Sequence, residues 1–198
     1  MKLILASFIS GVVLASPPPL HKNLIIPAGS HADCYPPDES LYDHRFWYLQ
    51  RDPSNQGGTG VWYTKVAGSL TYDEAVAACS DLGSGLTIAS ILTEEEKEMT
   101  SEIVSSGFTW IGLRRDISEW GVEDSGDVDW ADKKKWIWQG SGKSAEYTNW
   151  ATNMPNNNDA PEDCTVQNWY GNGSGKWDDY PCTWKFSTVC QLECKSQE

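Results

Sequence analysis

The chain has 198 residues, a formal net charge of −13 and eleven tryptophans. An acidic chain is a poor partner for nucleic acid and for anionic membranes, because both carry negative charge. This length fits one domain with short flanking segments.

The first fifteen residues have the pattern of a secretory signal peptide. Lys2 precedes an apolar run from Leu3 to Leu14, and the small residue Ala15 follows. The run is too short to span a bilayer, and no later apolar run approaches eighteen residues. We therefore expect residues 1–15 to be a signal peptide and the product to be secreted, extracellular and soluble, without membrane insertion.

Residues 16–45 are rich in proline and predict an N-terminal tail without a core of its own. Aromatic, strand-like pieces at 46–48 and 61–63 then flank Asn55–Gly58, a pattern typical of a hairpin. The six cysteines all follow the signal, and an even number in a secreted chain predicts three disulfides. The count alone leaves fifteen connectivities open.

Two helices are predicted from their first turns. Thr71 and Glu74 have the spacing of a capping box, and apolar residues up to Leu82 then repeat at helical spacing, before Gly83. The segment 93–96 has the same capping-box pattern and opens a second helix, which buries Met99 and Ile103. Strand-like runs are found at 86–91, 110–113 and 187–192.

Oxygen-bearing side chains gather between residues 150 and 182, in a stretch that begins as an irregular loop without apolar periodicity. A set of oxygen ligands without histidine or free thiolate suits Ca²⁺ better than zinc or copper. The candidate ligands are Asn156, Glu162, Asp178 and Asp179.

A second acidic stretch runs from Arg114 to Lys135. Its acids do not follow the order of an EF-hand loop, so we interpret the stretch as a solvated insertion. They are Glu123, Asp124, Asp127 and Asp129.

The motifs of the long loop resemble those of the C-type lectin-like domain family. The matching pieces are Met154-Pro155-Asn156, Glu162-Asp163-Cys164, Trp177-Asp178-Asp179 and Cys182. Met154 stands where the family has an acidic or amide oxygen, and Asp178 stands where it usually has asparagine. The resemblance extends over about Trp47 to Cys194 and includes Trp110-Ile111-Gly112-Leu113.

The resemblance implies an α+β fold, in which two helices flank antiparallel sheets and a long irregular loop binds the ligand. The domain would cover residues 46–194, followed by a short C-terminal tail, 195–198. The family pattern also implies the disulfides Cys79–Cys190 and Cys164–Cys182. Cys34 and Cys194 would then pair with each other, or Cys34 would form an intermolecular bond.

The resemblance further implies one calcium site built from Asn156, Glu162, Asp178 and Asp179, with a cis peptide bond before Pro155. Asn156, Glu162 and Asp178 would contact carbohydrate. Asp163 matches a ligand of a second calcium site in the family. Asn157, however, replaces an acid there, so we expect a single ion.

These residues are compatible with three functions. The first is a secreted, calcium-dependent lectin that binds a glycan or glycoprotein. The second is a calcium-independent lectin-like module that binds a protein or another non-sugar ligand, with the loop altered by Met154. The third is an enzyme such as a glycosidase, disfavoured because the sequence shows no sign of a raised-pKa acid in a dry cleft and the cysteines are committed to disulfides. The histidines all fall in the tail, at positions 21, 31 and 44.

Two further features bear on the surface. Asn172-Gly173-Ser174 is an N-glycosylation sequon in a predicted turn. For the tryptophans, packing in the core is the simpler interpretation, and stacking on sugar is the alternative for one or two of them.

Overall fold

The computed structural model describes residues 46–51, 60–116, 132, 135–158, 161–168 and 174–194. These residues form two helices and a mixed sheet with the strand order β1-β2-β8-β4-β6-β7, to which β3 is added on β8 and β5 on β4. The elements are β1 (Phe46–Gln50), β2 (Gly60–Leu70), α1 (Tyr72–Asp81), β3 (Leu86–Ile88), α2 (Glu94–Val104), β4 (Thr109–Arg115), β5 (Trp136–Trp138), β6 (Cys164–Gln167), β7 (Trp177–Tyr180) and β8 (Phe186–Cys194).

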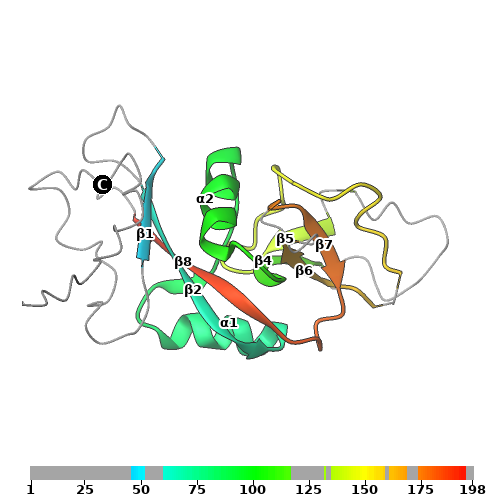
Figure 1. Ribbon diagram of the computed structural model, residues 1–198, viewed down its shortest axis with the longest axis horizontal. Helices are drawn as coiled ribbons and strands as arrows, with labels where there is room; N and C mark the ends of the chain where they lie inside the picture. Colours follow the sequence, from blue (N-terminus) through cyan, green and yellow to red (C-terminus); the bar gives the residue numbers. More distant parts are fainter. Residues whose placement is uncertain are drawn as a thin grey trace, which may run out of the picture.

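The long antiparallel pair β2–β8 separates the two helices (Figure 1). Side chains alternate between the two faces of a strand, so neighbouring residues enter different cores. Trp62 and Cys190 pack with α1, whereas Tyr63 and Val189 pack with Ile103 of α2. The predicted hairpin is confirmed, because β1 pairs antiparallel with β2.

The predicted start of α1 is confirmed. The Thr71 hydroxyl accepts a hydrogen bond from the Glu74 N–H at 3.4 Å, and the Glu74 carboxylate accepts one from the Thr71 N–H at 2.8 Å. This reciprocal pair is a capping box, and it satisfies two backbone donors that the helix leaves unpaired.

The prediction of a second capping box at α2 is wrong. Thr93 does cap the helix by accepting from the Glu96 N–H at 3.2 Å. The Glu96 carboxylate, however, is fully buried, and it accepts from Arg51 Nε at 2.5 Å and from the Leu92 N–H at 2.6 Å. Because a buried carboxylate requires a counter-charge, the guanidinium that follows β1 draws Glu96 away from the reciprocal position.

Both disulfides implied by the resemblance are present. Cys79–Cys190 joins α1 to β8, and Cys164–Cys182 joins β6 to the turn after β7. Cys194 is also disulfide-bonded. Cys34 lies outside the described residues, so its pairing with Cys194 or with another molecule stays a prediction.

The tryptophans in the described part of the chain mostly fill the core, as the simpler interpretation predicted. Trp136, Trp138 and Trp177 form a core under the second half of the sheet, β4 to β7, together with Ile111 and Leu113. Trp110 is also fully buried, whereas Trp184 is 48% exposed.

The strand predicted at 110–113 is longer than expected and runs from Thr109 to Arg115. Arg114 and Arg115 therefore belong to β4 and not to the acidic insertion. The reason is pairing with β5, in which Arg114 lies opposite Ile137 and Arg115 opposite Trp136.

Several predictions fall outside the described residues. They concern the signal peptide 1–15, the tail 16–45, the C-terminal residues 195–198, the sequon residue Asn172 and the acids Glu123, Asp124, Asp127 and Asp129. Neither α1 nor α2 has the length and apolar character needed to cross a bilayer.

Candidate functional site

The candidate loop, residues 151–163, is described except for residues 159 and 160. It leaves the sheet region at Ala151, whose N–H donates to the Trp177 carbonyl at 2.8 Å, and returns at Asp163, whose carbonyl accepts from the Arg115 N–H at 2.9 Å. The Met154–Pro155 peptide bond is cis, as the resemblance implied. Both ends of the loop are thus fastened to the sheet.

Asp179 anchors the centre of the candidate loop. Its side chain comes from β7 and is buried, and its carboxylate accepts from the Asn156 N–H at 2.9 and 3.1 Å and from the Asn157 N–H at 2.7 Å. Asn157 has a φ of 49°, in the left-handed region that asparagine tolerates better than most residues. Asparagine at this position therefore allows the backbone to present two successive N–H groups to one carboxylate.

Glu162 closes the loop from its C-terminal side. Its carboxylate accepts from the Asn158 N–H at 2.7 Å, and its own N–H donates to the Asn157 side-chain oxygen at 2.9 Å. The Asn156 side-chain oxygen also accepts from the Asn158 N–H, at 3.0 Å. The structure therefore brings Asn156, Glu162 and Asp179 into one hydrogen-bonded unit.

Asp178 differs from these three residues. It is only 5% exposed, and its Oδ1 atom is buried without a hydrogen-bond partner. Burial, together with the negative charges of Asp179 and Glu162, raises the pKa of Asp178 to about 7.

Burial also raises the pKa of Asp179, although the N–H groups of Asn157 and Asn156 oppose the shift. Two adjacent carboxylates thus share a buried region, and the charge of Asp179 disfavours ionisation of Asp178. An acid in such a place is stabilised either by a proton or by a cation.

The donor atoms of the candidate residues suit a hard cation, but their present positions do not form a metal-binding group. Three carboxylates and one amide oxygen are ligands that Ca²⁺ prefers. Within the described part of the chain, however, no three His, Cys, Asp or Glu side chains form a group that could hold a metal ion. The oxygens of Asp179, Glu162 and Asn156 accept backbone N–H groups, and Asp178 Oδ1, which is buried without a hydrogen-bond partner, is the atom whose environment most directly fits a cation.

Asp163 has a different partner from the one that the resemblance implied. Instead of standing open to a second calcium ion, its carboxylate accepts from Arg115 Nε at 2.5 Å, and both side chains are largely buried. Sequence reasoning missed Arg115, because it assigned this residue to the insertion. The available signal was its place two residues after Leu113, at the end of an apolar strand whose side chains alternate between faces.

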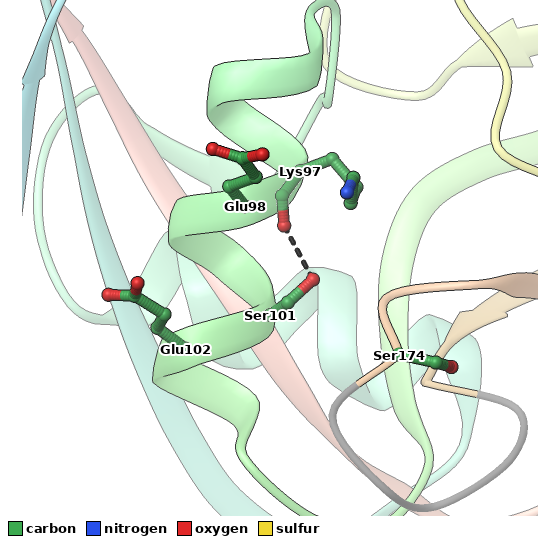
Figure 2. A pocket seen from close by; sticks show the side chains of 5 residues that line it. All are labelled: Lys97, Glu98, Ser101, Glu102 and Ser174. Atoms are coloured by element: carbon green, nitrogen blue, oxygen red, sulfur yellow. Dashed lines mark hydrogen bonds between the residues drawn. The ribbon is translucent and has the colours of Figure 1, made fainter.

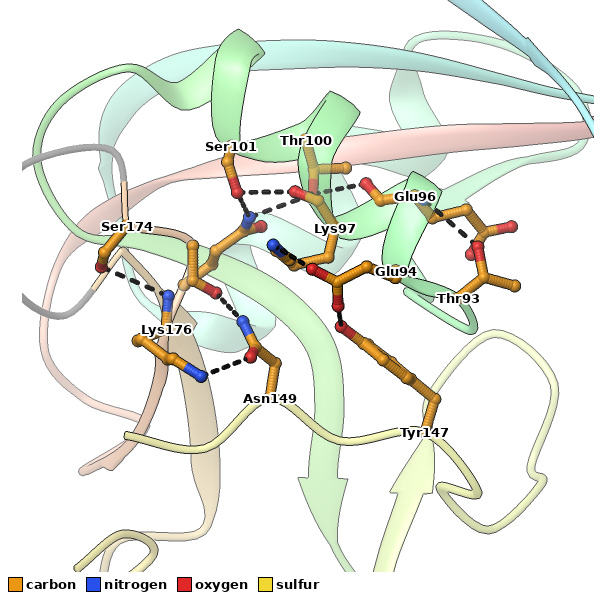
Figure 3. Close-up of polar contacts among 12 residues, drawn as sticks. Thr93, Glu94, Glu96, Lys97, Thr100, Ser101, Tyr147, Asn149, Ser174 and Lys176 are labelled. Atoms are coloured by element: carbon orange, nitrogen blue, oxygen red, sulfur yellow. Dashed lines mark hydrogen bonds and ion pairs between the residues drawn. The ribbon is translucent and has the colours of Figure 1, made fainter. Parts of the chain in front are cut away.

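Polar contacts join α2 and the segment before β7 to the segment that leads into the candidate loop (Figure 3). Tyr147 donates to Glu94 at 2.6 Å. Asn149 donates to the Gly175 carbonyl at 2.7 Å and accepts from Lys176 at 2.8 Å. The segment that leads into the candidate loop is therefore fixed before residue 151.

A groove lies away from the candidate residues, between α2 and the segment before β7 (Figure 2). Its lining combines one lysine with two glutamates and two serines, and none of the predicted site residues contributes to it. The lining residues are Lys97, Glu98, Ser101, Glu102 and Ser174.

The geometry offers little for hydrolysis. A glycosidase needs two carboxylates on either side of a scissile bond, one as acid and one as base or nucleophile. Asp178 has the raised pKa of an acid, but the carboxylates of Asp179 and Glu162 are engaged by loop N–H groups.

The amino-acid sequence of the chain is similar to that of known proteins. The family model described as the lectin C-type domain matches residues 68–192. Lectin BRA-3 from Megabalanus rosa is 30% identical over 123 residues, which cover 62% of this chain and 65% of that protein. An alpha-N-acetylgalactosamine-specific lectin from Patiria pectinifera is 30% identical over 142 residues, covering 67% of this chain and 74% of that protein.

A solved structure agrees with these relatives. The cow C-type carbohydrate-recognition domain of CD23, solved in the presence of GlcNAc2Man3 oligosaccharide, superposes with a TM-score of 0.52 at 26% identity, covering 68% of this chain and 89% of that one. The match spans less than two thirds of some relatives, including 25% of E-selectin from Sus scrofa. The α+β architecture, the two disulfides and the matched region agree, and the chain belongs to the C-type lectin domain family.

Proposed function

We propose that the protein is a secreted, calcium-dependent lectin that binds a glycan or glycoprotein. The observation that carries the proposal is Asp178, whose Oδ1 atom is buried without a hydrogen-bond partner. Glu162 and Asp179 add negative charge around it. A divalent cation would stabilise all three carboxylates in the ionised form, so the site gains most from an ion that prefers oxygen.

The residues that would hold the ion are Asn156, Glu162, Asp178 and Asp179. When bound, calcium would offer its remaining coordination positions to water or to two neighbouring hydroxyl groups of a sugar. The protein contributes the shape of the site, since Asp179 already fixes the backbone at Asn156 and Asn157. One ion per chain is proposed, because Asp163 is paired with Arg115.

The class of ligand is supported by the relatives. One of them is specific for alpha-N-acetylgalactosamine by name, and the CD23 domain was solved in the presence of a mannose-containing oligosaccharide. These sugars differ, so they support carbohydrate as the class without selecting one sugar. The secretory signal predicted at residues 1–15 is consistent with an extracellular glycan.

Met154 is expected to weaken or redirect sugar binding. Where an oxygen could accept from a sugar hydroxyl, Met154 offers a thioether, a weak acceptor. Glu162 and Asp178 are both acceptors, so a hydroxyl between them would find no amide donor. A mispaired polar group in such a site costs about 1–3 kcal/mol.

A calcium-independent, lectin-like binding module is the second candidate, and one observation favours it. The candidate loop is already closed by its own hydrogen bonds, from Asn156 and Asn157 to Asp179 and from Asn158 to Glu162. A loop that holds its shape in this way could present a surface to a protein or another non-sugar ligand without an ion.

Binding of the mature protein to a glycan array, in calcium and in excess chelator, separates the two candidates. The lectin proposal predicts glycan binding that chelator abolishes. The variant Met154→Glu restores an oxygen and should strengthen both calcium and glycan binding, whereas Thr152→Glu adds the same charge at an exposed position of the same loop and serves as the control. Binding to a protein ligand that is equal in calcium and chelator, with no glycan bound, would favour the second candidate.

A further inference from the structure

Arg115 makes two bonds to one residue at the end of the candidate loop. Its Nε atom donates to the Asp163 carboxylate at 2.5 Å, and its backbone N–H donates to the Asp163 carbonyl at 2.9 Å. The Arg115 side chain is only 7% exposed and that of Asp163 12%. A charge-assisted contact in a largely buried place is stronger and more directional than a surface ion pair.

The strand that carries Arg115 is one of the most firmly packed elements. Ile111 and Leu113 of β4 are fully buried, and Arg115 lies opposite Trp136 of β5. On its other side β4 pairs with β6 through Arg114 and Cys164. Arg115 therefore projects from a rigid base, and its position does not depend on the loop.

Asp163 links Arg115 to the candidate ligand Glu162. Glu162 precedes Asp163 directly, and Cys164 follows it with a disulfide to Cys182. Held by Arg115 on one side and by the disulfide on the other, Asp163 leaves its neighbour little freedom. Glu162 then bonds to Asn157 and Asn158 across the loop.

The charge of Arg115 also matters in this place. Glu162, Asp163, Asp178 and Asp179 are all buried, and Arg115 pairs with one of these four acids, Asp163. A guanidinium keeps its charge at every pH at which the protein is folded, unlike a bound metal, which can dissociate. Asp163 therefore keeps its counter-charge in the metal-free protein.

We propose that Arg115 is a positioning residue, which acts as a permanent internal counter-cation and sets Glu162 in place through Asp163 before any ligand binds. The C-terminal side of the candidate loop, residues 161–163, is thereby independent of metal. The N-terminal side, residues 154–157, depends on the Asp179 carboxylate and is the part that responds to a cation, whereas the Asn158 N–H donates to Glu162. The inference rests on the proposed function where it concerns calcium affinity, but not where it concerns the order of the loop.

The test compares Arg115→Met, Arg115→Lys and the control Arg114→Met in the mature protein. Arg114 is the neighbouring residue and is half-buried, but it pairs with Asp73 at 3.5 Å, away from the loop. Amide hydrogen exchange in excess chelator is followed at Glu162 and Asn158 and, as the internal reference, along β2 and β8. Calcium affinity is measured by titration calorimetry on the same variants.

Arg115→Met should speed exchange at the Glu162 and Asn158 amides at least tenfold more than along β2 and β8, and should raise the calcium Kd at least tenfold. Arg115→Lys should recover part of both effects, and Arg114→Met should show neither. If exchange in Arg115→Met rises equally everywhere, or stays unchanged in the loop, Arg115 only supports the fold and the inference is overturned.

A variant that does not fold and a wild-type protein that binds no calcium have different consequences for the inference. If Arg115→Met does not fold, Asp163→Asn makes the same comparison, because it keeps an oxygen to accept from Arg115 Nε and removes the charge. If the wild-type protein binds no calcium, the proposed function fails, whereas loop-specific exchange in the variants would still support the positioning role of Arg115.

Discussion

Two regions of the molecule are stabilised by different forces. One is the region around β2, β8 and α1, and the other is the candidate loop. Around β2 and β8, buried apolar side chains such as Trp62, Tyr63 and Val189 pack against the helices, and a disulfide joins α1 to β8. In the loop, carboxylates accept backbone N–H groups, and Asp178 Oδ1 has no partner. Apolar packing is insensitive to ions, whereas the stability of clustered carboxylates depends on protons and cations.

The difference shows how one fold can keep its shape while its ligand site varies. Substitution at a loop carboxylate should alter ion binding without loss of the fold. Substitution in the β2–β8 core should alter stability without changing which ion is bound. The following experiments test this separation, beginning with the largest expected effect.

The two disulfides should affect different properties. Cys79 and Cys190 are 111 residues apart, and Cys164 and Cys182 are 18 apart. In the chain-entropy model their removal by paired alanine substitution lowers the free energy of unfolding by about 4–5 and about 3 kcal/mol, respectively. Urea unfolding measures both values, and calcium titration should show a weaker Kd only for the Cys164/Cys182 variant. An equal loss of calcium affinity in both variants would contradict the separation.

Asp178→Asn should weaken calcium binding while stabilising the metal-free protein. The amide keeps an oxygen for the ion but loses the negative charge, so the Kd should rise about tenfold, which corresponds to about 1.4 kcal/mol. Without calcium, the neutral amide removes repulsion from Asp179 and Glu162, so the melting temperature at pH 8 should rise. Calorimetry and thermal unfolding give the two values. An unchanged Kd would show that the charge of Asp178 does not contribute to binding of the ion.

The stability of the metal-free protein should fall as pH rises toward 7. Because the folded protein raises the pKa of Asp178 from 3.8 to about 7, the folded form binds this proton more tightly than the unfolded form does. The resulting stabilisation is complete below about pH 4 and is lost as pH rises through 7, with a slope of at most about 1.4 kcal/mol per pH unit.

Denaturant unfolding between pH 5 and 8 measures this slope, and Asp178→Asn is the control in which it should largely disappear. Saturating calcium should reduce the slope as well, because the ion stabilises the carboxylate form. The same slope in wild type and Asp178→Asn would show that another group is responsible.

Thr71→Ala should produce the smallest effect. It removes the hydroxyl that caps α1 and should cost about 1 kcal/mol of stability. Since α1 does not contact the candidate loop through any described hydrogen bond, calcium affinity should be unchanged. A change in Kd would mean that the helix and the loop are coupled.

Much of the fold could be predicted from the sequence, because local patterns determine it. The capping box at Thr71 and Glu74, the hairpin and the two disulfides follow from spacing and from the family motifs. The second capping box could not be excluded in this way, since the partner of Glu96 is Arg51, 45 residues away in the chain. Long-range ion pairs leave no periodic signal.

The motifs could predict the candidate residues but not the contacts that these residues make. The motifs identify Asn156, Glu162, Asp178 and Asp179, and the structure brings them to one region. That Asp179 accepts the loop N–H groups, and that Arg115 rather than a metal pairs with Asp163, depends on how strands and loop meet in space. Such contacts become visible only once β4, β6 and β7 are placed side by side.

The most direct test of the central claim is calorimetric titration of calcium into the metal-free mature protein at pH 7.5. We predict that one ion binds per chain and that protons are released, because Asp178 must ionise. The observed binding enthalpy should therefore differ between buffers of different ionisation enthalpy. Absence of binding in the wild-type protein, at protein and calcium concentrations at which Met154→Glu binds, would contradict the claim and assign the loop to a calcium-independent ligand.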